Sequence, residues 1–216
     1  SDPQGSASSG LGIDIDNFKC GTYEVIEQSC DVKDAITKSS AINVDIIASN
    51  IDLVAIEIEL VDIEDREYML KKSLKSIKSK YDYIIIDCAP SLGLLTINAL
   101  TASDSIIIPI QCEYFALEGL GKLLNTIKSI QKIHNSLLEI EGLLLTMYDS
   151  RLRLSNQVVE EVKNHFNNMV FKTIIQRNVS LGEAPGFGES IINYDVNSKG
   201  ASNYLSLAKE FLLNQN

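Results

Sequence analysis

One acidic side chain stands directly after a run of apolar residues. The stretch 81–91 reads YDYIIIDCAPS, so Asp87 ends a run that is typical of a buried strand. Ligands of open parallel sheets bind at the carboxyl ends of the strands. A carboxylate in that place, followed by Ala-Pro-Ser, suits a Walker B role, in which it holds Mg²⁺ beside a nucleotide phosphate. An apolar run that ends in aspartate is common, so further residues have to support this interpretation.

A second carboxylate stands near the front of the chain, in SDPQGSASSGLGI. Asp2 precedes Pro3, and an Asp-Pro turn before a Ser/Gly loop is what we expect after a buried strand. In isolation the Asp-Pro pair predicts an ordinary Asx turn. The sequence contains no phosphate-binding loop of the form G-x-x-x-x-G-K-[ST]. Its one Gly-Lys pair, Gly121-Lys122, is followed by leucine within a helical stretch.

Alternating strands and helices are predicted to position these side chains. Strands are expected at 43–49, 81–91, 105–111 and 140–149, with 170–176 as a short strand or bend. Helices are expected within 22–39 and at 50–59, 64–79, 94–102, 114–134, 155–167 and 199–213, and 178–190 is irregular. Strands that are apolar on both sides and alternate with helices predict a doubly wound α/β fold, a mostly parallel sheet with helices on both faces. We expect one domain over residues 1–216.

Charge and cysteine usage restrict the function classes. Residues 1–70 hold 15 acidic and 4 basic side chains, whereas residues 71–216 hold 14 acidic and 15 basic ones. The formal net charge of -10 argues against a broad nucleic-acid-binding surface but leaves room for a small basic patch on the second part. The four cysteines, Cys20, Cys30, Cys88 and Cys112, form no CxxC pair and are expected to be reduced thiols. No apolar run reaches the roughly 18 residues of a membrane span.

Several stretches together resemble the ParA/Soj family of chromosome- and plasmid-partitioning ATPases, in the deviant-Walker-A class of P-loop NTPases. These stretches are YDYIIIDCAPSLGLLTINAL, IPIQCEYFALEGL, LLLTMYDSR and RNVSLGEAPGFGESIINYD, followed by SKGASNYLSLAKE, and they keep the family's order. In the family, a strand ending in Asp-x-Asp-Pro-Gln-Gly follows the P-loop helix, and Ser1–Gly5 is similar to its tail. The resemblance therefore implies a P-loop NTPase-like fold that lacks the first strand, the P-loop and the first helix.

The resemblance also implies site residues. Asp2 matches the aspartate that orients the attacking water, and Asp87 matches the metal-shell residue. Thr146 and Met147, and the loop with Arg177, Asn178 and Pro185, match positions near the nucleotide. In that loop Gln176, Ser180 and Gly182 stand where the family pattern has proline, arginine and serine. The missing arginine weakens the case for DNA binding, since basic residues contact phosphates. The remaining DNA-contact candidates are Arg151, Arg153, Lys172 and Lys199.

For an intact protein, the resemblance implies an ATP- and Mg²⁺-dependent homodimer in the cytoplasm, associated with the nucleoid. Such a dimer binds DNA without sequence specificity and is stimulated by a ParB-like centromere-binding protein, with no membrane partner. Because residues 1–216 contain no P-loop lysine, we expect little or no ATPase activity from them.

Three alternatives remain open. The first is a MinD-like membrane-associated ATPase of division-site placement, although the carboxyl end, AKEFLLNQN, is short and nearly uncharged for a membrane-binding helix. The second is a non-catalytic interaction module left after loss of the P-loop. The third is an unrelated doubly wound binding protein, such as a receiver-like domain. The iron–sulfur reductases are disfavoured, because neither Cys88 nor Cys112 has their local context and both are interpreted as small buried hydrophobic residues.

Overall fold

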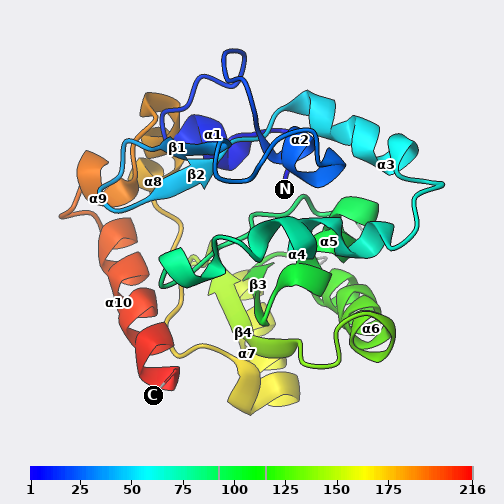
Figure 1. The fold of residues 1–216 in the computed structure, drawn as a ribbon. Helices are drawn as coiled ribbons and strands as arrows, with labels where there is room; N and C mark the ends of the chain where they lie inside the picture. Colours follow the sequence, from blue (N-terminus) through cyan, green and yellow to red (C-terminus); the bar gives the residue numbers. More distant parts are fainter. Residues whose placement is uncertain (92, 115, 216) are drawn as a thin grey trace. The chain divides into compact units, whose positions relative to one another are not determined.

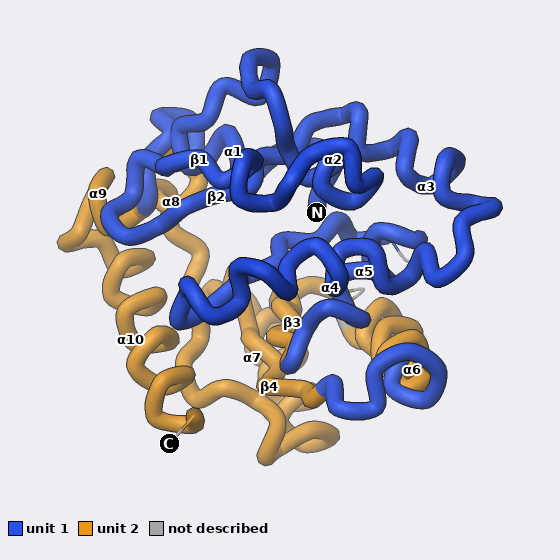
Figure 2. The backbone as a smooth tube through the Cα atoms, in the orientation of Figure 1, with its two compact units in different colours: residues 1–104, 130–138, 185–190 blue, residues 105–129, 139–184, 191–216 orange. Residues whose placement is uncertain are grey.

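The computed structural model describes residues 1–91, 93–114 and 116–215, which form two compact units (Figure 2). Unit 1 contains residues 1–104, 130–138 and 185–190, and unit 2 contains residues 105–129, 139–184 and 191–216. Both Asp2 and Asp87 belong to unit 1. Thr146, which ends a strand, and Met147, which follows it, belong to unit 2.

Unit 1 is mainly helical, with one small antiparallel sheet (Figure 1). Its elements are α1 (Ser6–Gly10), α2 (Thr22–Glu27), β1 (Ile36–Lys38), β2 (Asp45–Ile47), η1 (Ile51–Ala55), α3 (Ile56–Glu59), η2 (Arg66–Tyr68), α4 (Met69–Leu74), η3 (Lys78–Lys80) and α5 (Leu94–Ala102). Helices α2 to α5 share an apolar core in which Ile26, Leu53 and Ile56 are fully buried. Burial of these apolar faces is the main force that holds the short helices together, because isolated helices of this length are unstable in water.

Unit 2 contains a parallel strand pair and the remaining helices. Its strands are β3 (Ser105–Gln111) and β4 (Glu139–Thr146), and its helices are α7 (Arg153–Phe166), η4 (Asn167–Met169), α8 (Val179–Glu183), α9 (Ile191–Tyr194) and α10 (Lys199–Asn214). Residues 116–129 of α6 (Ala116–Ile133) also belong to it, and η5 (Ala184–Phe187) begins in it. Strands β3 and β4 run parallel, and two isolated parallel bridges, Leu143 to Val170 and Tyr148 to Gln176, add the segment 170–176. The helix-connected parallel pair confirms the expected α/β class.

Most predicted elements are present, but the stretch around Asp87 differs. Residues 82–91 form no strand with any part of the chain that the structure describes. The side chain of Ile85 is 92% exposed, although the sequence predicts a buried strand there. A strand of this composition needs pairing partners and two covered faces, and the described residues supply neither. Residues 36–38, expected within a helical stretch, form β1 instead, because they pair with β2.

The cysteines also differ from the expectation. Cys20 and Cys30 form a disulfide with a Cα–Cα distance of 6.4 Å, so the prediction of reduced thiols is wrong for this pair. Helix α2 lies between them and returns the chain, which brings together two cysteines that show no sequence motif. Cys112 is buried, as predicted, whereas Cys88 is exposed, so its interpretation as a buried hydrophobic residue is also wrong. None of the described helices is long and apolar enough to cross a bilayer.

We predict that breaking the Cys20–Cys30 disulfide lowers the free energy of unfolding by about 2–3 kcal/mol, because the bridge restricts a short loop in the unfolded chain. Urea denaturation of wild type with and without dithiothreitol, and of the Cys30→Ser variant, measures the change. Cys88→Ser is the matched control and leaves stability unchanged. Equal stability of the oxidised and reduced wild type would contradict the prediction.

Candidate functional site

Asp2 lies in a tight turn at the start of unit 1. Its side chain oxygen Oδ1 accepts a hydrogen bond from the Gln4 amide (2.9 Å), and its carbonyl accepts one from the Gly5 amide (3.0 Å). The Ser49 hydroxyl also donates to the Asp2 carbonyl, at 2.8 Å. Gly5 has φ 63°, and a Cβ there would collide with the Ser49 carbonyl, so only glycine fits this turn. The Asx turn expected from Asp-Pro is therefore present, and it holds Asp2 against Ser49.

Asp87 and Asp2 both act on the Cys88 thiol. Desolvation raises the pKa of this thiol, and the negative charges of Asp87 and Asp2 raise it further. Two side chains separated by 85 positions thus lie in the same part of unit 1.

The chemistry of this pair fits a magnesium ion that is shared with phosphate. Mg²⁺ is typically bound through one or two carboxylates and completes its octahedral shell with water and phosphate oxygens. Asp87 is exposed, so its oxygens are open to such a shell. Within the described part of the chain, no group of three or more acidic, histidine or cysteine side chains forms a self-sufficient metal site. The two carboxylates are of the residue type that holds Mg²⁺ when water and phosphate oxygens complete its shell.

A second group of predicted residues lies in unit 2, where β3 and β4 end. The register pairs Gln111 with Thr146, and the Thr146 hydroxyl donates to the Ile110 carbonyl at 3.3 Å. Met147 follows with φ 54°, a strained left-handed conformation for this residue type. The parallel pairing thus brings the two strand ends to one edge, where ligands bind in open parallel sheets.

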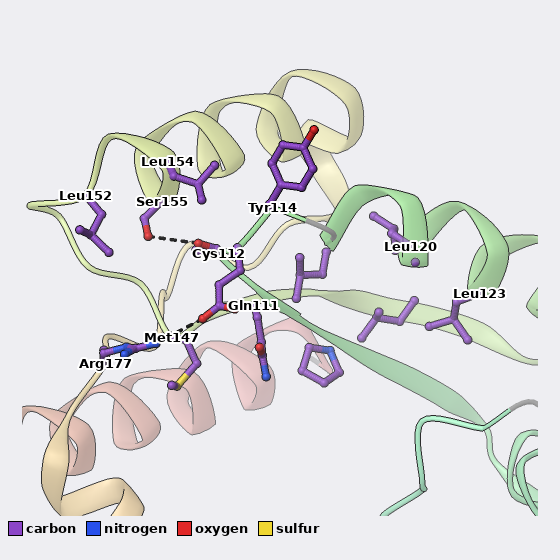
Figure 3. A pocket seen from close by; sticks show the side chains of 15 residues that line it. Gln111, Cys112, Tyr114, Leu120, Leu123, Met147, Leu152, Leu154, Ser155 and Arg177 are labelled. Atoms are coloured by element: carbon purple, nitrogen blue, oxygen red, sulfur yellow. Dashed lines mark hydrogen bonds and ion pairs between the residues drawn. The ribbon is translucent and has the colours of Figure 1, made fainter.

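A pocket of about 670 Å³ opens at this edge (Figure 3). Met147 and Arg177 line it and lie beside each other in Figure 3. The Arg177 guanidinium pairs with the Glu113 carboxylate at 3.2 Å, and the Arg177 amide donates to the Tyr148 carbonyl at 2.9 Å. The rest of the lining is mostly apolar and comes from β3, the segment 112–114, α6, and the region where α7 begins.

The other two residues predicted near the nucleotide, Asn178 and Pro185, are not among the residues that line this pocket. The Asn178 side chain caps α8 by accepting a hydrogen bond from the Leu181 amide at 3.3 Å, so its oxygen already has a structural role. Pro185 belongs to unit 1, where it lies against Gly10 of α1. The structure therefore groups Thr146, Met147 and Arg177 at one edge of unit 2, but it does not add Pro185 to that group.

Sequence reasoning missed the contribution of the segment that follows β3. The sequence predicts Gln111 as the end of a strand and no role for Cys112, Glu113 and Tyr114. All four line the pocket. The Cys112 amide donates to the Thr146 carbonyl at 3.0 Å, and its carbonyl accepts from the buried Ser155 hydroxyl at 3.1 Å. The available signal was their position just past the end of a parallel strand.

Two departures from the family pattern have local explanations. The Gln176 amide donates to the Asn203 side chain at 3.1 Å, a bond that a proline at this position could not make. The Ser180 hydroxyl donates to the Asp195 carboxylate at 3.2 Å, so the residue that replaces arginine joins the loop to the segment after α9. These positions therefore stabilise the loop from within unit 2.

The DNA-contact candidates all lie in unit 2, and one of them is paired internally. Arg151 donates to both carboxylate oxygens of Asp149, from Nε at 2.9 Å and from Nη2 at 2.7 Å. Hydrogen bonds from the Arg151 side chain and amide lower the pKa of Asp149 to about 2. Arg153, Lys172 and Lys199 are exposed, and Arg153 and Lys199 are the first residues of α7 and α10. Arg151 thus brings less net positive charge to a surface than the sequence implies.

We predict that the pKa of Asp149 is near 2 in wild type and returns towards the ordinary aspartate value in Arg151→Gln. The pKa of Asp149 is lower in the folded state than in the unfolded state, so its carboxylate stabilises the fold at pH values above the unfolded-state pKa. This stabilisation is lost as the pH falls through about 2. Carboxyl-detected NMR titration measures both values. Arg153→Gln is the control and leaves the Asp149 titration in place; an unshifted Asp149 in wild type would refute the pairing.

Comparison with known proteins shows which family the chain belongs to. A family profile described as an AAA domain matches residues 1–140. The chain is 55% identical to the sporulation initiation inhibitor protein Soj of Bacillus subtilis over 213 residues, which cover 99% of this chain and 84% of Soj.

Solved structures show the same fold. Cobyrinic acid a,c-diamide synthase from Mycobacterium smegmatis, crystallised with an ATP analogue and magnesium, has a TM-score of 0.78 and 34% identity over 92% of this chain and 82% of its own. A putative plasmid partition protein from Borrelia burgdorferi, bound to AMPPNP, has a TM-score of 0.82 and 28% identity, over 99% of this chain and 84% of its own. The fold defines an α/β protein of the P-loop NTPase type. The chain belongs to the ParA/Soj family of partitioning ATPases.

Proposed function

We propose that this chain is the greater part of an ATP-dependent partitioning protein that segregates chromosomal or plasmid DNA. The observation that carries the proposal is its 55% identity to Soj over 99% of its residues. The position of Asp2 and Asp87 in unit 1, where both act on the Cys88 thiol, supports it, because nucleotide hydrolysis needs a group for the water and a group for the metal. In this proposal the protein dimerises on ATP, binds DNA without sequence specificity and responds to a ParB-like centromere-binding protein in the cytoplasm, at the nucleoid.

Each site residue has a role within this proposal. Asp87 holds the magnesium shell, and Asp2 orients the attacking water. Magnesium, when bound, supplies positive charge that neutralises the phosphate oxygens. At the edge of unit 2, Thr146, Met147 and Arg177 contact the nucleotide, while Asn178 and Pro185 shape the loop that follows.

A non-catalytic interaction module remains the second candidate, and one observation favours it. The 216 residues contain no G-x-x-x-x-G-K-[ST] loop, so the lysine and the backbone amides that cradle phosphate in P-loop proteins have no counterpart in them. In that case the units retain partner binding without hydrolysis. Activity measurements separate the two candidates.

We predict that the polypeptide 1–216 releases phosphate from Mg-ATP at close to the rate without protein, because it lacks the P-loop lysine. Fusing to Ser1 the part of Bacillus subtilis Soj that precedes the matched region restores turnover. In that fusion, Asp87→Asn lowers turnover by about 100-fold, because one metal-shell group is lost. Phosphate release is measured with an enzyme-coupled assay.

The control for this experiment is Asp104→Asn, which removes an exposed aspartate paired with Lys78 and leaves turnover unchanged. Turnover by residues 1–216 comparable to that of Soj would contradict the first expectation. An active fusion that tolerates Asp87→Asn would remove Asp87 from the proposed mechanism.

DNA contact is proposed for the exposed basic residues of unit 2. We predict that the triple variant Arg153→Gln, Lys172→Gln and Lys199→Gln binds DNA duplexes of unrelated sequence more weakly than wild type, and all of them to the same extent. The slope of log K for DNA binding against the logarithm of the salt concentration becomes less steep by roughly 0.9 for each lost phosphate contact. Fluorescence anisotropy across a salt series measures this slope. Lys33→Gln, which removes an exposed lysine of unit 1, is the control. A triple variant with the wild-type slope would exclude this surface.

A further inference from the structure

The segment that carries Asp87 lacks the support that a sheet normally gives. Among the described residues, none of residues 84–91 takes part in a backbone–backbone hydrogen bond. The side chain of Ile85 is almost fully exposed, and Asp87 itself is exposed. A backbone with so few partners is mobile unless side chains hold it. The position of Asp87 therefore has to come from contacts before and after it.

Two contacts before Asp87 join the segment to the rest of unit 1. The Tyr81 hydroxyl donates to the Asp45 carboxylate at 2.8 Å, which joins the start of the segment to β2. Ile86 is partly buried against the apolar core of unit 1. These contacts fix where the segment begins and which side of it faces the core, but they leave the chain after Asp87 free to turn.

The contacts after Asp87 converge on one carboxylate, that of Glu57. Its Oε2 accepts a hydrogen bond from the Leu94 amide at 2.9 Å, and its Oε1 accepts one from the Leu95 amide at 3.2 Å. These are the first two amides of α5, where the helix dipole also favours a negative charge. Gly93 allows this approach, because a Cβ there would collide with the Glu57 carboxylate.

The same helix holds the end of the segment directly. The Thr96 hydroxyl of α5 donates to the Ser91 carbonyl at 2.7 Å. A helix whose first turn is fixed by Glu57 therefore also fixes Ser91, four positions after Asp87.

Glu57 is itself firmly placed. It belongs to α3, whose Ile56 is fully buried in the core of unit 1 together with Leu53 of η1. The neighbouring carboxylate of Glu59 points elsewhere and accepts a hydrogen bond from the Tyr23 hydroxyl at 2.8 Å. A buried side chain thus sets the direction of α3, and Glu57 is the one of its two carboxylates that reaches α5.

We infer that Glu57 is the positioning residue for Asp87: by capping the first turn of α5 from α3, it holds the loop 87–91, and with it the Asp87 carboxylate, in place within unit 1. The inference rests on the proposed function for its biological meaning, since there Asp87 holds the magnesium shell. Because the Glu57 carboxylate accepts hydrogen bonds from the amides at the amino end of α5, this helix end is not where a phosphate binds.

Cys88 provides a reporter directly beside Asp87. It is an exposed free thiol, whereas Cys112 is buried and Cys20 and Cys30 are joined in the disulfide, so a nitroxide reagent labels Cys88 selectively. The electron paramagnetic resonance line shape of the labelled full chain measures how freely the loop moves. Added Mn²⁺ broadens that signal when it binds nearby, and Mn²⁺ alone is the metal probe.

We expect Glu57→Ala to raise the mobile fraction of the Cys88 label about threefold or more, because the lost cap frees the loop. For the same reason, a higher Mn²⁺ concentration is needed for half-maximal broadening of the label signal. Glu57→Gln, which retains an acceptor oxygen, gives an intermediate mobility. Glu59→Ala, the matched change on the same helix, leaves the label as in wild type. Hydrogen exchange of the α4 amides stays unchanged in all three variants, which separates loop release from unfolding of unit 1.

Two outcomes would overturn the inference. The positioning role is excluded if the Cys88 label is no more mobile in Glu57→Ala than in wild type. It is also excluded if the label becomes more mobile only when hydrogen exchange of the α4 amides rises as well, and Glu57→Gln behaves as wild type. A different result would contradict the proposed function alone. If Glu57→Ala raises the mobility of the Cys88 label but Asp87→Asn leaves the Mn²⁺ broadening unchanged, Glu57 positions the loop and Asp87 does not bind the metal.

Discussion

The apolar core shared by α2, α3, α4 and α5 is the constraint on which the candidate site of unit 1 depends. In a parallel sheet, a metal-binding aspartate at a strand end is held by the ladder on both sides. Here the chain around Asp87 makes no such ladder among the residues described, and buried side chains take over that task. Ile56 fixes α3, α3 presents Glu57, and Glu57 fixes the start of α5. If the core packed differently, Asp87 would have no defined place.

A different kind of interaction organises the site of unit 2. Parallel pairing of β3 with β4 sets Gln111 beside Thr146, and the bridge from Tyr148 to Gln176 brings Arg177 to the same edge. Backbone hydrogen bonds determine these positions, so they depend little on which side chains are present. The side chains then decide the character of the pocket: one ion pair, between Arg177 and Glu113, stands in a mostly apolar lining. Such a lining suits a flat organic ring better than a phosphate.

The family relationship indicates the chemistry of the chain, whereas the structure shows how each residue is held. The 55% identity to Soj tells us which chemistry to look for, but it does not say how each residue is held. The structure shows that Asn178 is occupied in capping α8, that Arg151 is neutralised by Asp149, and that Gln176 uses an amide that proline lacks. These local arrangements separate side chains that are open to a ligand from side chains that the fold already uses.

The sequence alone determined the features that depend on local pattern. The helix 94–102, the strand 105–111 and the helix predicted at 199–213, which ends at Asn214, follow from apolar runs and the polar residues that bound them, which act over a few residues. The order of the family motifs comes from the resemblance. Only the tertiary structure decided the features that need distant partners. The run 82–87 has strand composition but no partner strand in the described part of the chain. Cys20 meets Cys30 because α2 turns the chain, and Glu57 meets α5 across 37 positions. Pairing and packing over such separations depend on where the whole chain goes, and a local pattern does not contain that information.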